Sequence, residues 1–458
     1  MSNQRHASTI KTVADAKALI DERNLAFVKV GLFDVDGIFR GKYMAADKFK
    51  SALEKGFGFC DVVLGWDSND QLYDNTRFTG WHTGYGDAQV RILPDTCREL
   101  PGENTVLFLA EFDQKAEAVC PRGLLRRVVE KAKAKGYHAQ GSCEFEFFLF
   151  EETPNSVDAK GFTGLKPISP GFFGYSMLRN SVFSDFYEEL LTTCKAMDFP
   201  LEGLHTETGP GVLEAAIEKA DVVTAADRGA LFKTYTKIVA QRRDWMATFM
   251  AKWSPDYPGQ SGHLHLSLKD QAGRSVFYDA SKPSQMSETM RHFIGGQQTL
   301  MPQVTAMIAP TVNSFSRLIP GFWAPTAASW GIENRTCALR AIPGSESSQR
   351  VEYRITAADI NPYIAMAAAL ATGLWGIENQ VEPDDPIEGN AYDRDFPVEK
   401  QLPKTLSEAA ESLRNSEIAK TLFGAEFCDH YAATRNWEER EFRKHISDWE
   451  LKRYFEII

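Results

Sequence analysis

The chain has 458 residues, of which 43% are hydrophobic and 25% charged, and its net charge is −11. This length can bury a large core and form more than one domain, and the composition is that of an ordinary globular protein. The acidic balance, without a basic stripe, excludes a nucleic-acid polyanion as the expected partner.

Seven scattered cysteines without CxxC pairs favour reduced thiols over a disulfide framework. No stretch approaches the length of an apolar membrane span, and the first residues contain no apolar signal core. We therefore expect a cytoplasmic protein with no membrane partner.

The N-terminal region predicts a helix followed by a β-hairpin. Residues 11–23 place apolar side chains on one helical face. Residues 25–34 are typical of a strand, Asp36-Gly37 of a hairpin turn, and residues 40–44 of the returning strand.

Residues 56–95 are rich in Gly, Asp and Asn and predict a long loop that is functional or lies at an interface. Asp61 and Asp67 lie in it, and each alone would be interpreted as a solvated acid or a turn former. Residues 105–112 predict another strand. Strands and helices alternate after Pro121, which indicates an α/β or α+β catalytic domain from about residue 111 onward.

The stretch Ser142–Phe150 (S-C-E-F-E-F-F-L-F) predicts a strand that carries Glu144 and Glu146 on one face. Burying two like charges is costly unless a cation neutralises them. Residues two apart on a strand are separated by about 6.6 Å, which suits two neighbouring cations better than one. An edge strand with both acids in water is the alternative, and the apolar opposite face argues against it.

Residues 201–217 (L-E-G-L-H-T-E-T-G-P-G-V-L-E-A-A-I) repeat the theme of carboxylates on an apolar strand. His205 and Glu207 share a face, and Glu214 follows the Gly-Pro-Gly turn. A lone glutamate here would be assigned to a salt bridge. Together with Glu146, however, these acids form an all-oxygen set that suits Mg²⁺ or Mn²⁺.

Residues 253–268 end in S-G-H-L-H-L-S-L, where His263, His265 and Ser267 point one way and leucines the other. Such a histidine pair fits a metal ligand plus a phosphate-facing donor, or equally a structural pair at a sheet edge.

Five arginines follow between residues 313 and 354. The planar guanidinium is the preferred clamp for carboxylate and phosphate, so the cluster indicates an anionic substrate. Surface arginines paired with local acids would explain one or two of them, but not the alternating R-V-E-Y-R strand. The arginines are Arg317, Arg335, Arg340, Arg350 and Arg354.

Two helical regions complete the chain. Residues 361–379 form an Ala-rich helix that we expect to be buried and structural. The C-terminal W-E-E-R-E-F-R-K segment predicts a solvated helix.

Six motifs in this order resemble the glutamine synthetase superfamily: C-E-F-E-F-F-L-F, H-T-E-T-G-P-G-V-L-E, S-G-H-L-H-L-S-L, N-S-F-S-R-L-I-P-G-F, N-R-T-C-A-L-R and R-V-E-Y-R-I. The resemblance implies an α+β fold, with an N-terminal β-grasp domain at residues 1–110 and a catalytic ATP- and glutamate-binding domain at 111–458. In the catalytic domain, antiparallel strands would form a funnel-shaped half-barrel flanked by helices. It also implies a homododecamer of two hexameric rings with active sites completed by the neighbouring N-terminal domain.

The resemblance further implies the roles of individual residues. Glu146, Glu207 and Glu214 would hold one Mg²⁺ or Mn²⁺ ion, and Glu144, His263 and Glu352 a second, with two to three ions per site. ATP would lie along His265, Ser267 and Arg350, glutamate would contact Arg317 and Arg354, and Arg335 and Arg340 would face the transferring phosphoryl group. Asp61, with Asp67 as the alternative, would take the proton of the incoming amine.

One departure from the family pattern concerns the amine. Members that use ammonia carry a flap glutamate in P-G-(Y/F)-E-A-P, whereas this chain has Pro320-Gly321-Phe322-Trp323-Ala324-Pro325. Val212 and Thr206 also replace the usual glutamine and histidine. An indole in place of an ammonium-binding carboxylate favours an alkylammonium ion over ammonium.

The chain therefore resembles the branch of the family that ligates glutamate to small amines through γ-glutamyl phosphate, with methylamine favoured. Isopropylamine or polyamine ligases, a glutamine synthetase using ammonia, and a non-catalytic scaffold are the alternatives. Control by modification of Tyr392 is a weaker interpretation than an ordinary loop tyrosine.

Overall fold

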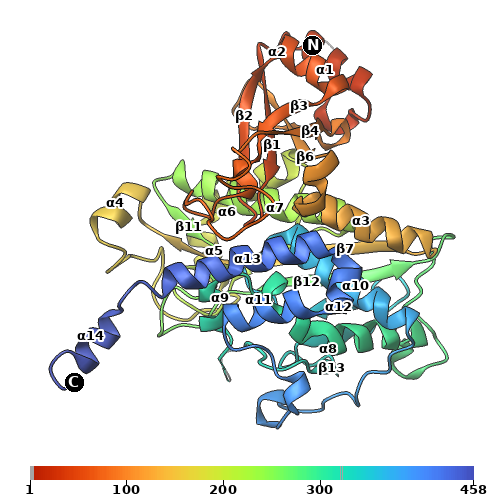
Figure 1. Cartoon of the computed structure of the whole chain (residues 1–458), viewed down its shortest axis with the longest axis vertical. Helices are drawn as coiled ribbons and strands as arrows, with labels where there is room; N and C mark the ends of the chain where they lie inside the picture. Colours follow the sequence, from red (N-terminus) through yellow and green to blue (C-terminus); the bar gives the residue numbers. More distant parts are fainter. Residues whose placement is uncertain (1–4, 320, 322) are drawn as a thin grey trace.

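The structure is a computed structural model that describes residues 5–319, 321 and 323–458. A smaller N-terminal part stands on a larger C-terminal part, and a short C-terminal arm projects away from both (Figure 1). Pro320 and Phe322 of the predicted flap lie outside the described residues.

The N-terminal part is a mixed sheet with two helices, as expected for the predicted β-grasp unit. Strand β1 pairs in parallel with β6 and antiparallel with β2, and the sheet order is β2-β1-β6-β4-β3. The predicted first helix and hairpin are confirmed. The elements are α1 (Val13–Glu22), β1 (Phe27–Phe33), β2 (Phe39–Ala45), α2 (Ala46–Lys55), β3 (Phe57–Cys60), β4 (Asp87–Ile92), β5 (Arg98–Glu99) and β6 (Val106–Phe112).

The prediction of one loop over residues 56–95 was wrong at both ends, because β3 and β4 pair there. Strand β3 is only four residues long and contains Gly58, so it lacks the alternation of apolar and polar side chains that would predict a strand. The irregular segment between them begins with a turn of 3₁₀ helix at Asp61–Leu64.

One hydrophobic cluster of the N-terminal part runs from Ala7 to Cys120. The domain boundary after residue 110 stays a prediction. Because β6 ends at Phe112 and Cys120 belongs to this cluster, we place the division nearer residue 120.

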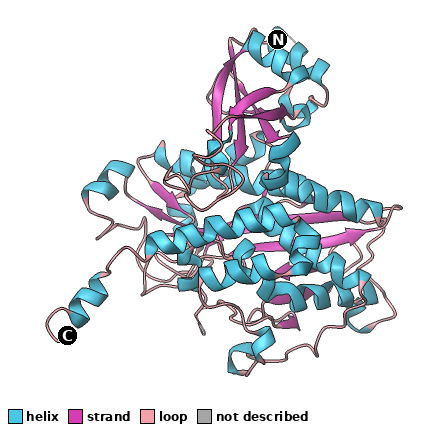
Figure 2. Ribbon diagram, in the orientation of Figure 1, coloured by secondary structure: helices cyan, strands magenta, loops and turns pink. Residues whose placement is uncertain are grey.

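A second sheet, centred on the 13-residue strand β7, lies among the helices of the C-terminal part (Figure 2). The order is β13-β14-β15-β12-β7-β9-β8, and every pairing in it is antiparallel except β13 with β14. Short strands β10 and β11 also pair with β7. The bounds are β7 (His138–Phe150), β8 (Leu201–Thr206), β9 (Val212–Ile217), β10 (Ala220–Asp221), β11 (Met246–Thr248), β12 (Gly262–Lys269), β13 (Trp330–Ile332), β14 (Leu339–Ile342) and β15 (Arg350–Tyr353).

Helices cover one face of this sheet and leave the other open. The odd face of β7, with Cys143, Phe145 and Phe147, belongs to the main core together with residues of α7, while the glutamates face the opposite way. Helix α10 is buried on nearly all sides, as predicted. The larger helices are α3 (Pro121–Ala134), α6 (Ser184–Ala196), α7 (Val222–Gln241), α8 (Glu288–Ile308), α10 (Pro362–Glu378), α11 (Leu406–Asn415) and α13 (Ala425–Phe442), and the shorter ones are α4 (Pro154–Ala159), α5 (Met177–Val182), α9 (Val312–Arg317), α12 (Glu417–Phe423) and α14 (Asp448–Tyr454).

The predicted solvated helix at the C-terminus is instead partly buried. Trp437 of α13 packs on Tyr73 of the N-terminal part, with ring centroids 5.8 Å apart. The many charges of this segment obscured its buried side, on which Glu439 is buried together with Trp437.

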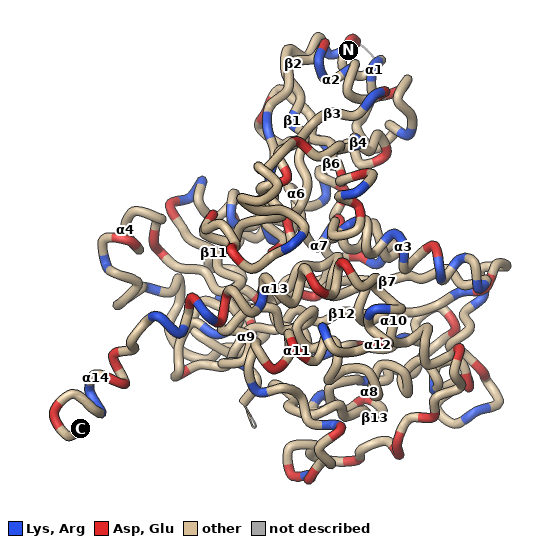
Figure 3. The backbone as a smooth tube through the Cα atoms, viewed as in Figure 1, with Lys and Arg blue, Asp and Glu red and all other residues tan. Residues whose placement is uncertain are grey.

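Basic and acidic residues are interspersed along the whole chain (Figure 3). Among the described residues, the helices are too short or too polar to cross a bilayer.

Candidate active site

The open face of the C-terminal sheet gathers acids and histidines from five strands, β7, β8, β9, β12 and β15. Glu144 of β7 lies opposite His263 of β12, and Glu146 lies opposite Glu214 of β9. His265 lies opposite Glu352 of β15. The register thus sets the predicted ligands side by side in a cavity of about 670 Å³.

The cavity contains most of the predicted site residues. Its lining includes Glu144, Glu146, Tyr175, His205, Glu207, Glu214, His263, His265, Trp323, Arg335, Arg340, Arg350, Glu352 and Arg354.

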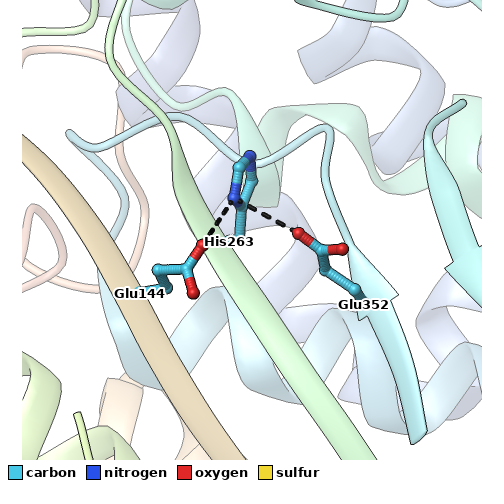
Figure 4. A group of neighbouring side chains, drawn as sticks. All are labelled: Glu144, His263 and Glu352. Atoms are coloured by element: carbon cyan, nitrogen blue, oxygen red, sulfur yellow. Dashed lines mark hydrogen bonds and ion pairs between the residues drawn. The ribbon is translucent and has the colours of Figure 1, made fainter. Parts of the chain in front are cut away.

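Glu144, His263 and Glu352 form one group of potential metal ligands (Figure 4). His263 Nδ1 lies 3.3 Å from Glu144 Oε1 and 3.4 Å from Glu352 Oε1. Burial, with a contribution from Arg354, lowers the pKa of His263, so its ring is neutral, which is the form that binds metals.

Both acids of this group remain charged. Although burial opposes it, nearby positive charge, including that of Arg354, holds the pKa of Glu352 down to about 2. Burial likewise opposes the charge on Glu144, but hydrogen bonds involving His263 and His265 hold its pKa well below the ordinary value. Two carboxylates and a neutral imidazole suit a hard divalent cation.

His205, Glu207 and Glu214 form a second group, with one ligand atom from each residue within 4.8 Å of the others. Burial, together with Glu144, raises the pKa of Glu214 to about 12. A carboxyl group that holds its proton this strongly is both removed from water and surrounded by other acids. A divalent cation at this position would supply the missing compensation.

Glu146 lies in the same cavity but outside that group, where His205 stands in its place. Its Oε2 accepts the backbone N–H of Ser261 at 2.6 Å. Burial, with Glu207 and Glu144, raises the pKa of Glu146 to about 7. The sequence placed His205 on the correct face but did not assign it to the metal site.

Tyr175 was missed by sequence reasoning. It comes from the loop after α4 and stacks on His205, with ring centroids 4.3 Å apart. The loop is irregular and rich in glycine, so its sequence contains no periodic signal for the tyrosine's position.

Four predicted arginines line the cavity, and two of them support Glu352. Arg340 Nη1 donates to Glu352 Oε2 at 3.0 Å and its Nε donates to Glu333 Oε2 at 3.0 Å. Arg354 Nη1 donates to the other oxygen of Glu352. Arg335 and Arg350 complete the basic wall.

Arg317 lies behind the wall of the cavity. It is 2% exposed, and its Nη1 and Nη2 donate to Ile355 O and Ser261 Oγ, both at 2.9 Å. Burial lowers its pKa to about 10.

The residues predicted to bind the nucleotide lie together in an adjoining hollow of about 390 Å³. Ser267 lines it, and His265 and Arg350 line both this hollow and the main cavity. Arg350 Nε donates to His265 Nδ1 at 3.2 Å.

The three residues predicted for the amine end are separated in the single chain. Trp323 lines the cavity and is 57% exposed. Asp61 lies in the N-terminal part, where Thr79 Oγ1 donates to its Oδ1 at 2.8 Å. Asp67 is 8% exposed, and its Oδ2 accepts from Trp437 Nε1 at 3.0 Å, which gives it a structural contact with α13.

Comparison with known proteins identifies the class to which this fold and site belong. A family description, "Glutamine synthetase, catalytic domain", matches residues 118–454. The chain therefore belongs to the glutamine synthetase family, whose members are ATP-dependent ligases.

Individual relatives are consistent with this assignment. The chain is 46% identical to type-1 glutamine synthetase 2 of Dictyostelium discoideum, over 94% of this chain and 84% of that protein. It is 37% identical to a glutamate–isopropylamine ligase of a Pseudomonas species, over 98% and 99% of the two chains. The solved structure of a GmaS complex with ADP is similar, with a TM-score of 0.83, 26% identity, and 96% and 99% of the two chains covered.

Proposed function

We propose that the protein joins L-glutamate to a small primary amine, with methylamine favoured, at the cost of ATP. A γ-glutamyl phosphate would form first, and the amine would displace its phosphate to give a γ-glutamyl amide. The observation that supports this choice is Trp323 in the cavity lining, where ammonia-using members of the family carry an acid. Relatives named as a glutamate–isopropylamine ligase, a γ-glutamylethanolamide synthetase and a γ-glutamylputrescine synthetase are consistent with it.

We propose that Mg²⁺ or Mn²⁺ ions, two to three per site, assist the reaction. Glu144, His263 and Glu352 would hold one ion, and Glu146, Glu207 and Glu214 another, with His205 beside it. The bound ions would neutralise the charge of the phosphate oxygens.

The arginines would then divide into two kinds. Arg340 and Arg354 keep Glu352 charged and in place, so only part of their donor capacity remains for substrate. Arg335 is the better candidate to face the transferring phosphoryl group, with Arg340 beside it. Arg354 would contact glutamate from within the cavity. Arg317 would contact glutamate only after its side chain moves, and would otherwise act on it indirectly through Ser261.

The amine would enter beside Trp323, in the cavity whose lining also includes Tyr175. An aromatic wall attracts an alkylammonium ion through its π face and methyl contact. Asp61 of a neighbouring subunit in the proposed dodecamer would take the proton before attack. The contact of Asp67 with Trp437 makes Asp61 the stronger candidate for the proton acceptor.

We place the reaction in the cytoplasm.

The test is phosphate release with ATP, Mg²⁺ and glutamate, across ammonium, methylammonium, ethylammonium, isopropylammonium and putrescine. We expect the highest kcat/KM with methylammonium. A preference for isopropylammonium or putrescine would retain the ligase and change its amine. If no amine of the panel stimulated phosphate release, the scaffold alternative would remain.

The second candidate is a glutamine synthetase that uses ammonia. The 46% identity to a protein of that name favours it. Ammonium would then give the highest kcat/KM in the same panel, and Trp323 would not set the choice of amine.

A further inference from the structure

A second large hollow, of about 570 Å³, lies between the N-terminal part and the C-terminal helices. Its lining comes from the loop at residues 75–78, from Lys115, from Arg414 of α11, and from one side of α13. These residues are different from those that line the candidate active site.

Two cations at this hollow form no close ion pair in the described part of the chain, although Lys115 acts on the charge of Asp61 from farther away. Among the described residues, the ion pairs include neither Arg77 nor Lys115, whereas Arg414 pairs with Glu411 at 2.7 Å and Asp429 at 4.0 Å. Lys115 Nζ lies 5.6 Å from the ring centre of Phe78. Two cations in the lining of one hollow, each without a close ion pair, attract an anion.

A buried histidine lies behind these cations. His430 is 3% exposed, and within the described ranges neither of its ring nitrogens makes a hydrogen bond. Burial lowers its pKa to about 4, although the backbone of Leu64 acts in the opposite direction. The ring is therefore neutral, and its single N–H is a buried donor beside the backbone of Leu64.

Two acids on α13 limit the kind of anion that fits. Glu426 and Asp429 also line the hollow, and Arg414 offsets only part of their charge. A large polyanion would meet these acids, whereas a small oxyanion can contact Arg77, Lys115 and His430 alone.

We propose that this hollow binds a small organic oxyanion, a carboxylate or a phosphate ester, and that its occupancy is transmitted to Asp61. The path is short. Thr76 Oγ1 donates to Thr79 O at 2.8 Å, and Thr79 Oγ1 donates to Asp61 Oδ1 at 2.8 Å. Lys115 is also close enough to act on the charge of Asp61. The consequence for catalysis rests on the proposed role of Asp61, whereas the binding does not.

Binding is tested by calorimetry on the full-length protein with succinate and with glycerol 3-phosphate, at constant ionic strength. These two probes separate the carboxylate from the phosphate source. We expect saturable binding of at least one probe, weakened at least tenfold by Arg77→Gln and by Lys115→Gln. The matched control Lys48→Gln, on the exposed side of α2, should leave it unchanged.

Anions could also enter the catalytic cavity, so the same titration is made with Arg335→Gln. Binding lost in Arg335→Gln but retained in Arg77→Gln belongs to the active site and overturns the proposal, as does the absence of saturable binding.

The coupling is tested with the anion that binds, by measuring KM for the preferred amine and for ATP. We expect a change of at least threefold in KM for the amine, absent in Arg77→Gln, and no change for ATP. An unchanged KM for the amine at a saturated hollow overturns the coupling. Calorimetry needs no turnover, so anion binding can be measured even if the proposed reaction does not occur. Failure of the proposed function and failure of the anion site are therefore distinguished.

Discussion

Trp323 is the residue on which the choice of amine depends. It adopts a left-handed backbone conformation with φ of 58° and presents its indole to the cavity. We expect Trp323→Glu to restore an ammonium-binding charge and to raise the kcat/KM ratio of ammonium to methylammonium at least tenfold, about 1.4 kcal/mol.

Trp323→Phe is the matched control, because it keeps an aromatic face and adds no charge. The ratio should then stay close to that of the wild type. An equal response of both variants would show that the loss of indole volume, and not the new charge, changes the selectivity.

Asp61 is expected to act on rate and not on stability. Burial raises its pKa, against a hydrogen bond from Thr79, and a carboxylate with a raised pKa is a stronger proton acceptor. Asp61→Asn should lower kcat/KM for the amine by about 10²- to 10⁴-fold, the usual range for a lost general base.

The thermal midpoint of Asp61→Asn should stay near that of the wild type. The rate of the variant should recover partly as pH rises, because more of the amine is then already unprotonated. A variant that keeps full activity at pH 7 would remove Asp61 from the mechanism.

At the scale of elements, helix α13 ties the N-terminal loop to the catalytic part. Asp67 Oδ2 accepts from Trp437, and Oδ1 accepts the backbone N–H groups of Asn69 and Gln71 at 2.8 and 2.9 Å. Asp67→Ala leaves these donors unpaired in a buried place. We expect a loss of about 2–3 kcal/mol in the free energy of unfolding, measured by urea denaturation.

Asp74→Ala is the control for Asp67→Ala. Asp74 also contacts α13, through an exposed ion pair with Arg440 at 2.6 Å. Its cost should be below about 1 kcal/mol. Equal losses for the two variants would contradict a special role of Asp67.

His430 gives α13 a pH-dependent contribution to stability. Its pKa is about 4 in the folded protein, because of burial, against an ordinary value of 6.5. Between these values the unfolded chain binds more protons, so the free energy of unfolding falls as pH decreases from 6.5 to 4. This contribution is about 3 kcal/mol. His430→Gln stays neutral, so its urea midpoint should fall less over this pH range. If the urea midpoints of the two proteins fell equally with decreasing pH, His430 would not be the source of this pH dependence.

The sequence predicted those features that depend on local alternation. The strand containing Glu144 and the Ala-rich helix α10 are both continuous, strongly patterned segments, and both were confirmed. The grouping of Glu144, His263 and Glu352 required the register of three strands and was reached only through the family resemblance.

What the sequence could not predict depends on contacts between distant segments. Tyr175 reaches His205 from an irregular loop, and the buried Trp437 packs on Tyr73 of the N-terminal part. The short strand β3 contains Gly58, so its sequence has no clear alternation from which its pairing with β4 could be predicted.

At the scale of the whole molecule, the C-terminal arm is the feature that a single chain does not explain. Helix α14 and the residues after it project from the body (Figure 1), and their apolar side chains are exposed. These side chains are Trp449, Leu451, Tyr454, Phe455, Ile457 and Ile458. Each large apolar side chain gains about 1.5–3 kcal/mol when fully buried, so an arm of this composition favours a partner surface.

The proposed dodecamer would provide that surface if the arm contacts another copy of the chain. A chain ending after Arg443, the C-terminal cap of α13, should therefore fold but assemble into a smaller particle, measured by mass photometry. Within the arm, Leu451→Asp should weaken assembly in the same direction, whereas Glu450→Gln, a neighbouring charge change, should not. If the truncated chain kept the particle mass of the full-length protein, the arm would not be an assembly element, and the rings would be held together by other surfaces. If it assembled normally but lost activity, the arm would instead act on the active site, since its removal leaves the helix that holds Asp67 complete.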